Sequence, residues 1–348
     1  MMNSNFWDEF EYNKLKLLLN IGKVNSIAEV ADGRRMSDKI FPISVEVHLT
    51  DKCNLNCKWC TDKELRKNGA TMSLDIIEKV FKEFGEHHTG VTLEGGGEPA
   101  LHPQFHDIVA AGNRYGIDLG LITNGTTDIS ESIHRLKWVR VSLDSSNGEE
   151  YKAEKGAALF EKVLGNLQNM TVMRNPQKTF IGVGYVLTKR NQSSLKELIK
   201  SLDEIGVDYL YFRPVEEAPD IMPTVDELLD LKKQLVEWTQ NTRIKYMLTI
   251  ADRVVDKNNN LPCIAHSLTS IIHANGDVSL CEKRRNETII LGNIKNNSFQ
   301  EIWESTYREQ MTQRLLNPEC QEGCSACRIT GFNMMFDRLG KLNTKHFI

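Results

Sequence analysis

Three cysteines lie close together in the segment Cys53-Asn-Leu-Asn-Cys57-Lys-Trp-Cys60, with three and then two residues between them. Residues 43–50, just before them, alternate apolar and polar side chains, which predicts a strand with one buried face. The cysteines should therefore lie on a loop at the C-terminal end of that strand. Three thiolates on one loop can hold three corners of an iron–sulfur cubane. The fourth iron then keeps an open position for a substrate or cosubstrate, and zinc with a distant histidine is the alternative.

Five further cysteines follow after a long cysteine-free stretch, at Cys263, Cys281, Cys320, Cys324 and Cys327. The polar N-terminal segment does not have the layout of a signal peptide, and no apolar run approaches the roughly 20 residues that span a bilayer. We therefore expect a cytoplasmic protein with no membrane partner. In such a protein two groups of cysteines indicate metal binding rather than disulfides.

Composition limits the class of protein further. The 348 residues are 40% hydrophobic and carry a formal net charge of -4. The apolar content is that of a globular protein. The charge argues against a nucleic-acid partner, which would require a basic surface to neutralise phosphates.

Strands and helices alternate through most of the chain. Further strands are predicted at residues 91–94, 117–123, 138–143, 179–187 and 209–214, with helices at 74–84, 103–115, 160–173 and 194–205 between them. Strands that alternate with helices form a parallel sheet, because each crossover returns to the same edge. About six such units between residues 43 and 240 predict an α/β fold.

The flanking segments differ in character. Residues 10–19 predict an amphipathic helix that packs on the domain, followed by a polar approach to Pro42. Beyond a helix at 226–238, Asn275-Gly276 predicts a hairpin turn between short strands at 270–273 and 278–280, and residues 298–311 predict one more helix. We expect an N-terminal helical segment at 1–40, a barrel domain at 41–250 and a cysteine-rich domain at 251–348.

The first cysteine group resembles the cluster-binding motif of the radical S-adenosylmethionine (SAM) superfamily. Trp59 matches the family's aromatic residue before the third cysteine, beside the SAM adenine. The turn at Gly95, Gly96, Gly97 and Glu98 matches the glycine-rich turn that holds the methionine moiety of SAM. Glycines allow close approach of a ligand, and the Glu98 carboxylate can face an ammonium group.

The resemblance also suggests contacts at the ends of later strands. Ser142, Asp144 and Ser145, near the end of the fourth strand, correspond to positions that contact the SAM ribose and carboxylate. Asn124 resembles the middle residue of the family's Thr-Asn-Gly. Arg213 and Glu216, at the end of the sixth strand, are candidate substrate contacts at the expected active-site mouth.

The resemblance implies a partial (β/α)6 TIM-like barrel with its active site at the C-terminal ends of the strands. It implies that a reduced 4Fe-4S cluster donates one electron to SAM, and that the resulting 5'-deoxyadenosyl radical takes a hydrogen atom from the substrate. It also implies a flavodoxin- or ferredoxin-type electron donor.

The second cysteine group resembles the C-terminal SPASM and twitch extensions of radical SAM enzymes, which form a small α+β iron–sulfur domain. The full SPASM pattern uses more cysteines for two clusters, whereas five suffice for one with four ligands. The resemblance to the twitch form favours one auxiliary 4Fe-4S cluster on Cys263, Cys281, Cys324 and Cys327. Cys320 could instead replace Cys324 or Cys327 as a ligand, and a structural zinc ion in this region is a further alternative.

These features favour a radical SAM oxidoreductase. The twitch resemblance suggests oxidation of a small, sugar-like carbinol or amine, with the auxiliary cluster accepting the electron. A peptide-modifying maturase is the alternative, although the forty residues before the barrel are too few for the peptide-binding domain that such enzymes commonly carry. A non-catalytic electron carrier or redox sensor is the second alternative, and the glycine turn with Glu98 argues against it.

Overall fold

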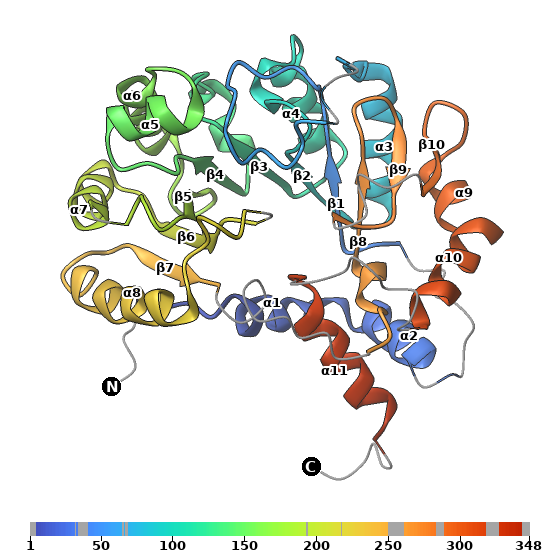
Figure 1. The fold of residues 1–348 in the computed structure, drawn as a ribbon. Coiled ribbons are helices and arrows are strands. Elements are labelled where there is room, and N and C mark those ends of the chain that lie inside the picture. Colours follow the sequence, from blue (N-terminus) through green and yellow to red (C-terminus); the bar gives the residue numbers. More distant parts are fainter. Residues whose placement is uncertain are drawn as a thin grey trace.

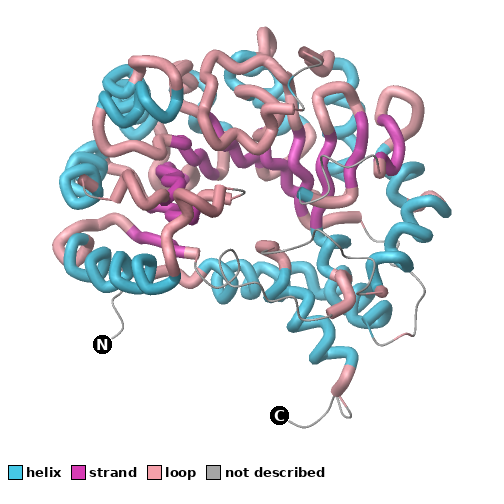
Figure 2. Tube along the Cα trace, viewed as in Figure 1, coloured by secondary structure: helices cyan, strands magenta, loops and turns pink. Residues whose placement is uncertain are grey.

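The computed structural model describes residues 5–31, 33, 41–64, 66, 69–192, 194–216, 218–249, 261–282, 289–317 and 327–342. Ten strands of these residues form one sheet in the order β10-β9-β8-β1-β2-β3-β4-β5-β6-β7. The sheet curves around the centre of the molecule, with helices on its outer side (Figures 1 and 2). The strands are β1 (Ser44–Val47), β2 (Gly90–Leu93), β3 (Leu119–Thr123), β4 (Trp138–Ser142), β5 (Phe180–Leu187), β6 (Tyr209–Pro214), β7 (Lys245–Leu248), β8 (Thr269–Ile272), β9 (Asp277–Ser279) and β10 (Ile290–Asn293).

Every neighbouring pair from β1 to β7 is parallel, as predicted. β8 also pairs in parallel with β1, and the β8–β9 and β9–β10 pairs are antiparallel. Strands from the C-terminal cysteine-rich region therefore extend the same sheet beyond β1. The C-terminal cysteine-rich region and the first cysteine loop are thus joined to one sheet, through β8 and β1.

Helices connect and cover these strands. They are α1 (Glu9–Leu17), α2 (Ile21–Ala31), α3 (Leu74–Glu86), α4 (Phe105–Arg114), α5 (Gly148–Lys155), α6 (Phe160–Met173), α7 (Leu195–Ile205), α8 (Val225–Trp238), α9 (Phe299–Trp303), α10 (Thr306–Leu316) and α11 (Thr330–Gly340). Short 3-10 helices occur at Leu18–Asn20, Pro99–Leu101, Ser130–Arg135 and Ala265–Leu268.

The alternation of side chains along β4 shows how the sheet separates its two faces. Val139 and Val141 are fully buried in the core that the helices cover. Arg140 and Ser142, one residue out of phase, face the cavity on the opposite side of the sheet. A strand exposes successive residues to opposite faces, so one short segment supplies both packing and polar chemistry.

Several predicted elements require correction. The sheet contains a seventh parallel strand, β7, beyond the six expected units. The predicted helix at 298–311 is two helices, because Ser305 caps a new one by accepting a hydrogen bond from the Arg308 amide at 3.1 Å. Helices α2, α5 and α11 and strand β10 were not predicted.

The N-terminal helix also packs differently from the prediction. Leu17 is buried, but Leu15, Leu18 and Leu19 are 60%, 67% and 87% exposed. The following helix α2 buries Ile27 and Val30 instead, in a cluster that includes Phe336 of α11. The expected boundary near residue 250 falls at the start of residues 250–260, outside the described part of the chain, so the domain limits stay a prediction.

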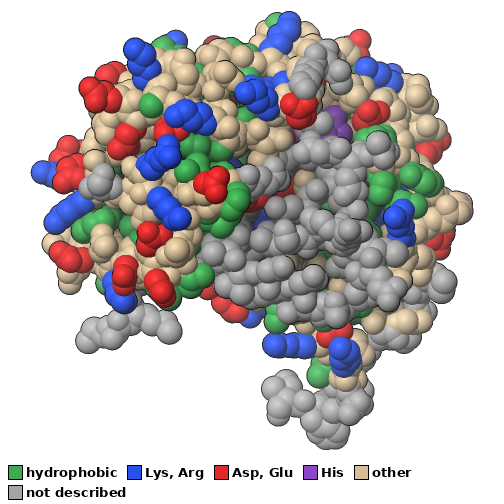
Figure 3. All heavy atoms as spheres, viewed as in Figure 1, with side chains coloured by type: hydrophobic (Ala, Val, Ile, Leu, Met, Phe, Trp, Pro, Cys, Tyr) green, Lys and Arg blue, Asp and Glu red, His purple; other side chains and the backbone are tan. Residues whose placement is uncertain are grey.

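The surface carries charges of both signs. Basic and acidic side chains alternate over the coloured part of the face in Figure 3. Among the helices that the structure describes, none has the length and apolar character needed to cross a bilayer.

Candidate active site

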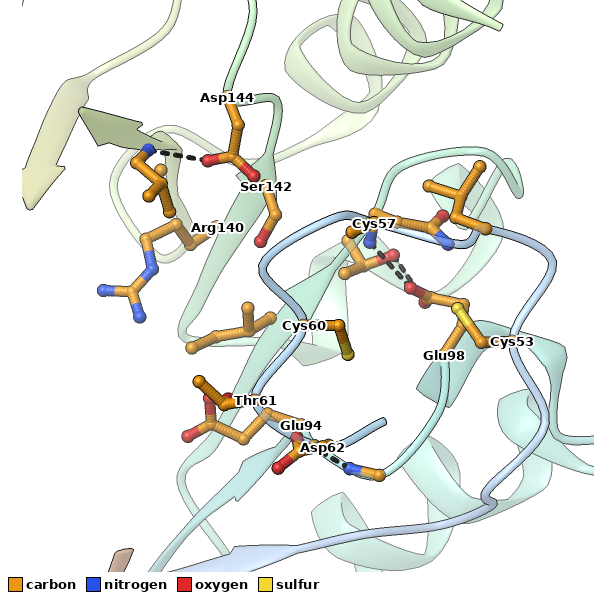
Figure 4. A pocket seen from close by; sticks show the side chains of 18 of the residues that line it. Cys53, Cys57, Cys60, Thr61, Asp62, Glu94, Glu98, Arg140, Ser142 and Asp144 are labelled. Atoms are coloured by element: carbon orange, nitrogen blue, oxygen red, sulfur yellow. Dashed lines mark hydrogen bonds between the residues drawn. The ribbon is translucent and has the colours of Figure 1, made fainter. Parts of the chain in front are cut away.

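A polar cavity lies at the C-terminal ends of the parallel strands. It contains about 1480 Å³ of space free of protein atoms, including solvent at its mouth. Figure 4 shows the three cysteines of the first group on one loop around the same cavity as Glu94 and Glu98. Of the predicted site residues, those that line it are Cys53, Cys57, Trp59, Cys60, Gly95, Gly96, Gly97, Glu98, Asn124, Ser142, Asp144, Arg213 and Glu216. Ser145 is fully buried and is not among the lining residues.

Main-chain hydrogen bonds hold the cysteine loop against helix α5. The amides of Asn56 and Lys58, on either side of Cys57, donate to the carbonyls of Lys155 and Glu154, each at 3.1 Å. Burial raises the pKa of the Cys57 thiol, and the nearby Lys155 ammonium opposes that rise. For Cys57 to bind iron as a thiolate, its thiol must lose its proton, and burial makes that loss less favourable.

The glycine turn after β2 fits against the residues that lead into the cysteine loop. The Gly97 amide donates to the Thr50 carbonyl and the Glu98 amide to the Lys52 carbonyl, each at 2.8 Å. A Cβ at Gly97 would lie 2.0 Å from the Lys52 carbonyl oxygen, and one at Gly95 would lie 2.0 Å from His48 Nε2. Only glycine permits these approaches, and the φ of +73° at Gly95 favours glycine as well.

Glu98 joins the glycine turn to the end of β3. Its Oε1 accepts hydrogen bonds from the Ala100 amide at 3.0 Å and the Thr123 hydroxyl at 2.6 Å, and its Oε2 accepts from the Asn124 amide at 2.6 Å. Burial raises the pKa of this carboxyl, and these three donors oppose the rise. A carboxylate has about four acceptor positions, so roughly one remains for an external donor such as the predicted ammonium group.

Asp144 and Lys155 form a buried ion pair at the end of β4. Their side chains are only 6% and 4% exposed. Asp144 Oδ1 also accepts from the Val186 amide at 2.7 Å, and the residue has a φ of +57°. Burial by itself would lower the pKa of Lys155, but Asp144 and then Cys57 outweigh it, and the net shift is upward. The cavity therefore contains a permanent cation beside Cys57.

Lys155 is a site residue that the sequence analysis missed. It is the last residue of helix α5, which begins at Gly148. The side chain of Asn147, just before the helix, accepts a hydrogen bond from the Glu150 amide at 3.0 Å. An asparagine before a polar segment with two early glutamates is a recognisable helix start. That signal would have placed Lys155 at the helix end, facing the loop.

A second group of charges lines the cavity below the glycine turn. Arg328 pairs with Glu46 of β1 at 2.5 Å and with Glu282 at 2.6 Å. The Arg140 guanidinium lies over the Tyr211 ring, 4.5 Å from its centroid. Burial raises the pKa of Glu94, and Arg140 and Arg328 oppose that rise.

The predicted substrate contacts at the rim of this cavity interact with each other. Arg213 Nη1 donates to Glu216 Oε1 at 3.3 Å. Both residues line the cavity, close to the end of β6. Their role toward a substrate stays a prediction.

The second cysteine group reaches the same cavity through its neighbours in sequence. Glu282 and Arg328 directly follow Cys281 and Cys327, and both line the cavity. Cys263 is held by its amide, which donates to the Leu315 carbonyl at 3.0 Å, and by Asn333 Nδ2, which lies 3.7 Å from its sulfur. Cys320 and Cys324 lie outside the described residues, so the choice between them stays open.

The first loop fits an iron–sulfur cluster better than a single ion. Within the described ranges no three His, Cys, Asp or Glu side chains converge on one metal position. A cubane does not require such convergence, because each thiolate binds a different iron. Three thiols spaced around one cavity therefore suit a cluster in which each binds a different iron.

Comparison with known proteins gives two matching family models in the predicted order. The radical SAM superfamily model matches residues 47–202, and a SPASM iron–sulfur cluster-binding domain matches residues 263–328. The first domain contains the cavity-lining cysteine loop. The second contains the C-terminal cysteines.

Curated relatives are distant but match most of the chain. The chain is 24% identical over 317 residues to a tungsten-containing aldehyde ferredoxin oxidoreductase cofactor-modifying protein of Pyrococcus furiosus, covering 80% of this chain and 86% of the relative. It is 23% identical over 304 residues to the mycofactocin maturase MftC of Mycobacterium tuberculosis, covering 82% and 75%.

Solved structures share the fold. Streptococcus suis SuiB bound to S-adenosylmethionine matches with a TM-score of 0.62 at 14% identity, covering 76% of this chain and 66% of SuiB, slightly less than two thirds of its length. anSMEcpe with bound AdoMet and a peptide matches with a TM-score of 0.61 at 17% identity, covering 83% and 87%.

Proposed function

Because this chain belongs to the radical SAM superfamily and carries a SPASM iron–sulfur cluster-binding domain, we propose that it cleaves SAM to modify a peptide by hydrogen-atom abstraction. The observation that carries SAM cleavage is the shared cavity. Cys53, Cys57 and Cys60, the glycine turn and the Asp144–Lys155 pair all line it. When bound, the 4Fe-4S cluster supplies the electron that turns SAM into a source of the 5'-deoxyadenosyl radical.

Different residues of the cavity contact different parts of the SAM molecule. Lys155 is a buried cation suited to the SAM carboxylate, and the remaining acceptor position of Glu98 suits the ammonium group. Ser142 and Asp144 lie where the ribose would contact the end of β4, and Trp59 offers an aromatic face to the adenine. These groups bind and orient SAM.

A peptide substrate is supported by what the relatives and structural neighbours are described as doing. MftC is a maturase, SuiB has been solved bound to its precursor peptide SuiA, and anSMEcpe has been solved with peptides. The cavity contains about 1480 Å³ of space free of protein atoms, solvent at its mouth included, and we infer that it takes up part of an extended peptide. One auxiliary 4Fe-4S cluster on Cys263, Cys281 and two of the three last cysteines completes the proposal.

Oxidation of an anionic small molecule is the second candidate. Arg140 lines the cavity with its guanidinium over the Tyr211 ring, and a guanidinium can bind a carboxylate or phosphate through two nitrogen atoms. Another relative, 24% identical over 276 residues, is a probable GTP 3',8-cyclase of Pyrococcus abyssi, whose named substrate is a small phosphorylated molecule.

The experiment begins with anaerobic reconstitution, reduction with dithionite and measurement of 5'-deoxyadenosine. Formation of 5'-deoxyadenosine supports SAM cleavage. Its absence with both clusters intact would contradict an enzymatic role and favour an electron carrier or redox sensor. Synthetic peptides encoded beside the gene are then compared with GTP and aminocyclitols. Stimulation by a peptide, with a mass change in that peptide, supports the maturase, whereas stimulation only by a small molecule contradicts it.

A further inference from the structure

Tyr151 of helix α5 is fully buried, yet its hydroxyl has no hydrogen-bond partner in the part of the chain that the structure describes. Leaving a buried hydroxyl unpaired costs about 1–3 kcal/mol. The Tyr151 ring is fixed, because its helix is capped at Asn147 and the ring packs 5.9 Å from that of Phe160. The hydroxyl is therefore held in one position, where it can donate a hydrogen bond.

The position of Tyr151 directs this donor toward the cysteine loop. Tyr151 precedes Lys155 by four residues, so the two side chains share a face of α5. That face meets the loop, because Lys155 lines the same cavity as Cys57 and acts on its thiol. The end of α5 is also bonded to the amides on both sides of Cys57. The charged groups that act on the Tyr151 hydroxyl are Lys155, Cys57, Asp144 and Glu98.

Three of these four neighbours are already engaged. Lys155 is a donor itself and is hydrogen-bonded to Asp144. Asp144 also accepts from the Val186 amide, and Glu98 accepts three hydrogen bonds from its own surroundings. Asp144 and Glu98 keep spare acceptor positions, but both are already stabilised by hydrogen bonds. The Cys57 sulfur accepts none among the described residues, and it gains acceptor strength when it loses its proton to bind iron.

We propose that the Tyr151 hydroxyl donates a hydrogen bond to the Cys57 sulfur when that thiolate binds the SAM-binding cluster, and that this bond makes the cluster easier to reduce. Reduction adds a negative charge to the cluster, and a donor stabilises the more negative form more strongly. Hydrogen bonds to cluster sulfurs are among the factors that set the reduction potential. This inference rests on the proposed function in one respect, that Cys57 binds iron.

The test is the midpoint potential of the first cluster in the full-length reconstituted protein, followed by electron paramagnetic resonance during a redox titration. Its signal is assigned by its loss in the Cys53, Cys57 and Cys60 triple alanine variant. Tyr151→Phe should make reduction about tenfold less favourable, a downward shift of about 59 mV for one electron, and the auxiliary cluster should not change. An unchanged first-cluster potential, or an equal shift of both clusters, would overturn the proposal.

A matched control is available in the same chain. Tyr246 is also fully buried with a hydroxyl that has no hydrogen-bond partner among the described residues, and its strand β7 lies at the opposite end of the run of parallel strands from β1, which leads into the cysteine loop. Tyr246→Phe removes the same kind of group and should leave both potentials unchanged. A shift in this variant equal to that of Tyr151→Phe would assign the effect to general loosening of the fold and overturn the proposal.

Two further measurements keep the proposal testable. If Tyr151→Phe binds no cluster, 3-fluorotyrosine at position 151 retains the ring and hydroxyl and makes it a stronger donor, so the midpoint should rise; no rise would overturn the proposal. The 5'-deoxyadenosine assay separates this inference from the proposed function. A cluster whose potential depends on Tyr151, in a protein that never cleaves SAM, would refute the function and leave the hydrogen bond standing.

Discussion

The two cysteine groups are positioned in different ways, although both reach one cavity. The first is held by main-chain hydrogen bonds, from the glycine turn to Thr50 and Lys52 and from Asn56 and Lys58 to the end of α5, and also by the Asn54 side chain, which bonds to those of Asn124 and Thr126, each at 2.9 Å. At Cys263 in the second group a distant side chain takes part. Asn333 Oδ1 accepts from the Ile264 and Ala265 amides at 2.9 and 2.7 Å, across about seventy residues. The first group thus depends on backbone segments that the fold brings together from distant parts of the chain, whereas the backbone after Cys263 depends on the single side chain of Asn333.

The largest effect should come from removing the first group of thiols. In a Cys53, Cys57 and Cys60 triple alanine variant, 5'-deoxyadenosine formation should be abolished, because nothing then binds the cluster that contacts SAM. About four irons per chain should remain, as expected for one auxiliary cubane. Iron analysis and product assay measure both. Zinc in place of that iron would contradict the prediction of an auxiliary cluster, and the two cysteine groups would then bind different metals.

This contrast also explains how much the sequence could predict. The cysteine loop, the Gly95 to Glu98 turn and Asn124 line one cavity, and the sequence could bring them together because each follows a strand of regular pattern. Lys155, Glu282 and Arg328 were missed as lining residues, since they come from an unpredicted helix and from the C-terminal region. Strand β7, at Lys245–Leu248, was not predicted, although its burial alternates along its four residues.

Removal of the buried cation should have the next largest effect. Lys155→Met leaves Asp144 charged and unpaired in a buried position, which should cost about 3–5 kcal/mol of unfolding free energy. Denaturant unfolding measures the loss. The Lys155→Met substitution should also weaken SAM binding, which calorimetry measures.

The double variant Lys155→Met with Asp144→Asn controls for this interpretation. It removes both charges, and asparagine tolerates the positive φ at position 144. The double variant should recover part of the lost stability but none of the SAM affinity. A double variant as unstable as the single one would show that the pair supports the first loop through packing instead of charge.

A smaller effect should follow from one added carbon atom at the glycine turn. In Gly97→Ala the new Cβ would overlap the Lys52 carbonyl oxygen, and overpacking of this kind costs about 1–3 kcal/mol. Displacement of the loop by a fraction of an ångström should lower 5'-deoxyadenosine formation by about 10²-fold. Gly165→Ala is the matched control, because no heavy atom lies within 4 Å of its added Cβ. Equal activity of the two variants would show that the glycine turn does not position the first cysteine group.

The smallest effect should come from the side chain that holds Cys263 in the second group. Asn333→Ala leaves the buried Ile264 and Ala265 amides without their acceptor, which should cost about 1–3 kcal/mol. Because Asn333 also contacts the Cys263 sulfur, the auxiliary cluster should be lost more readily than the first cluster on mild chelation. Iron content and the two paramagnetic signals follow this loss. The exposed Asn169→Ala, which removes a surface amide bonded to Asp128 at 2.9 Å, should change neither signal. Loss of the first cluster together with the second in Asn333→Ala would show that the two groups form one cooperative unit, contrary to the difference between them.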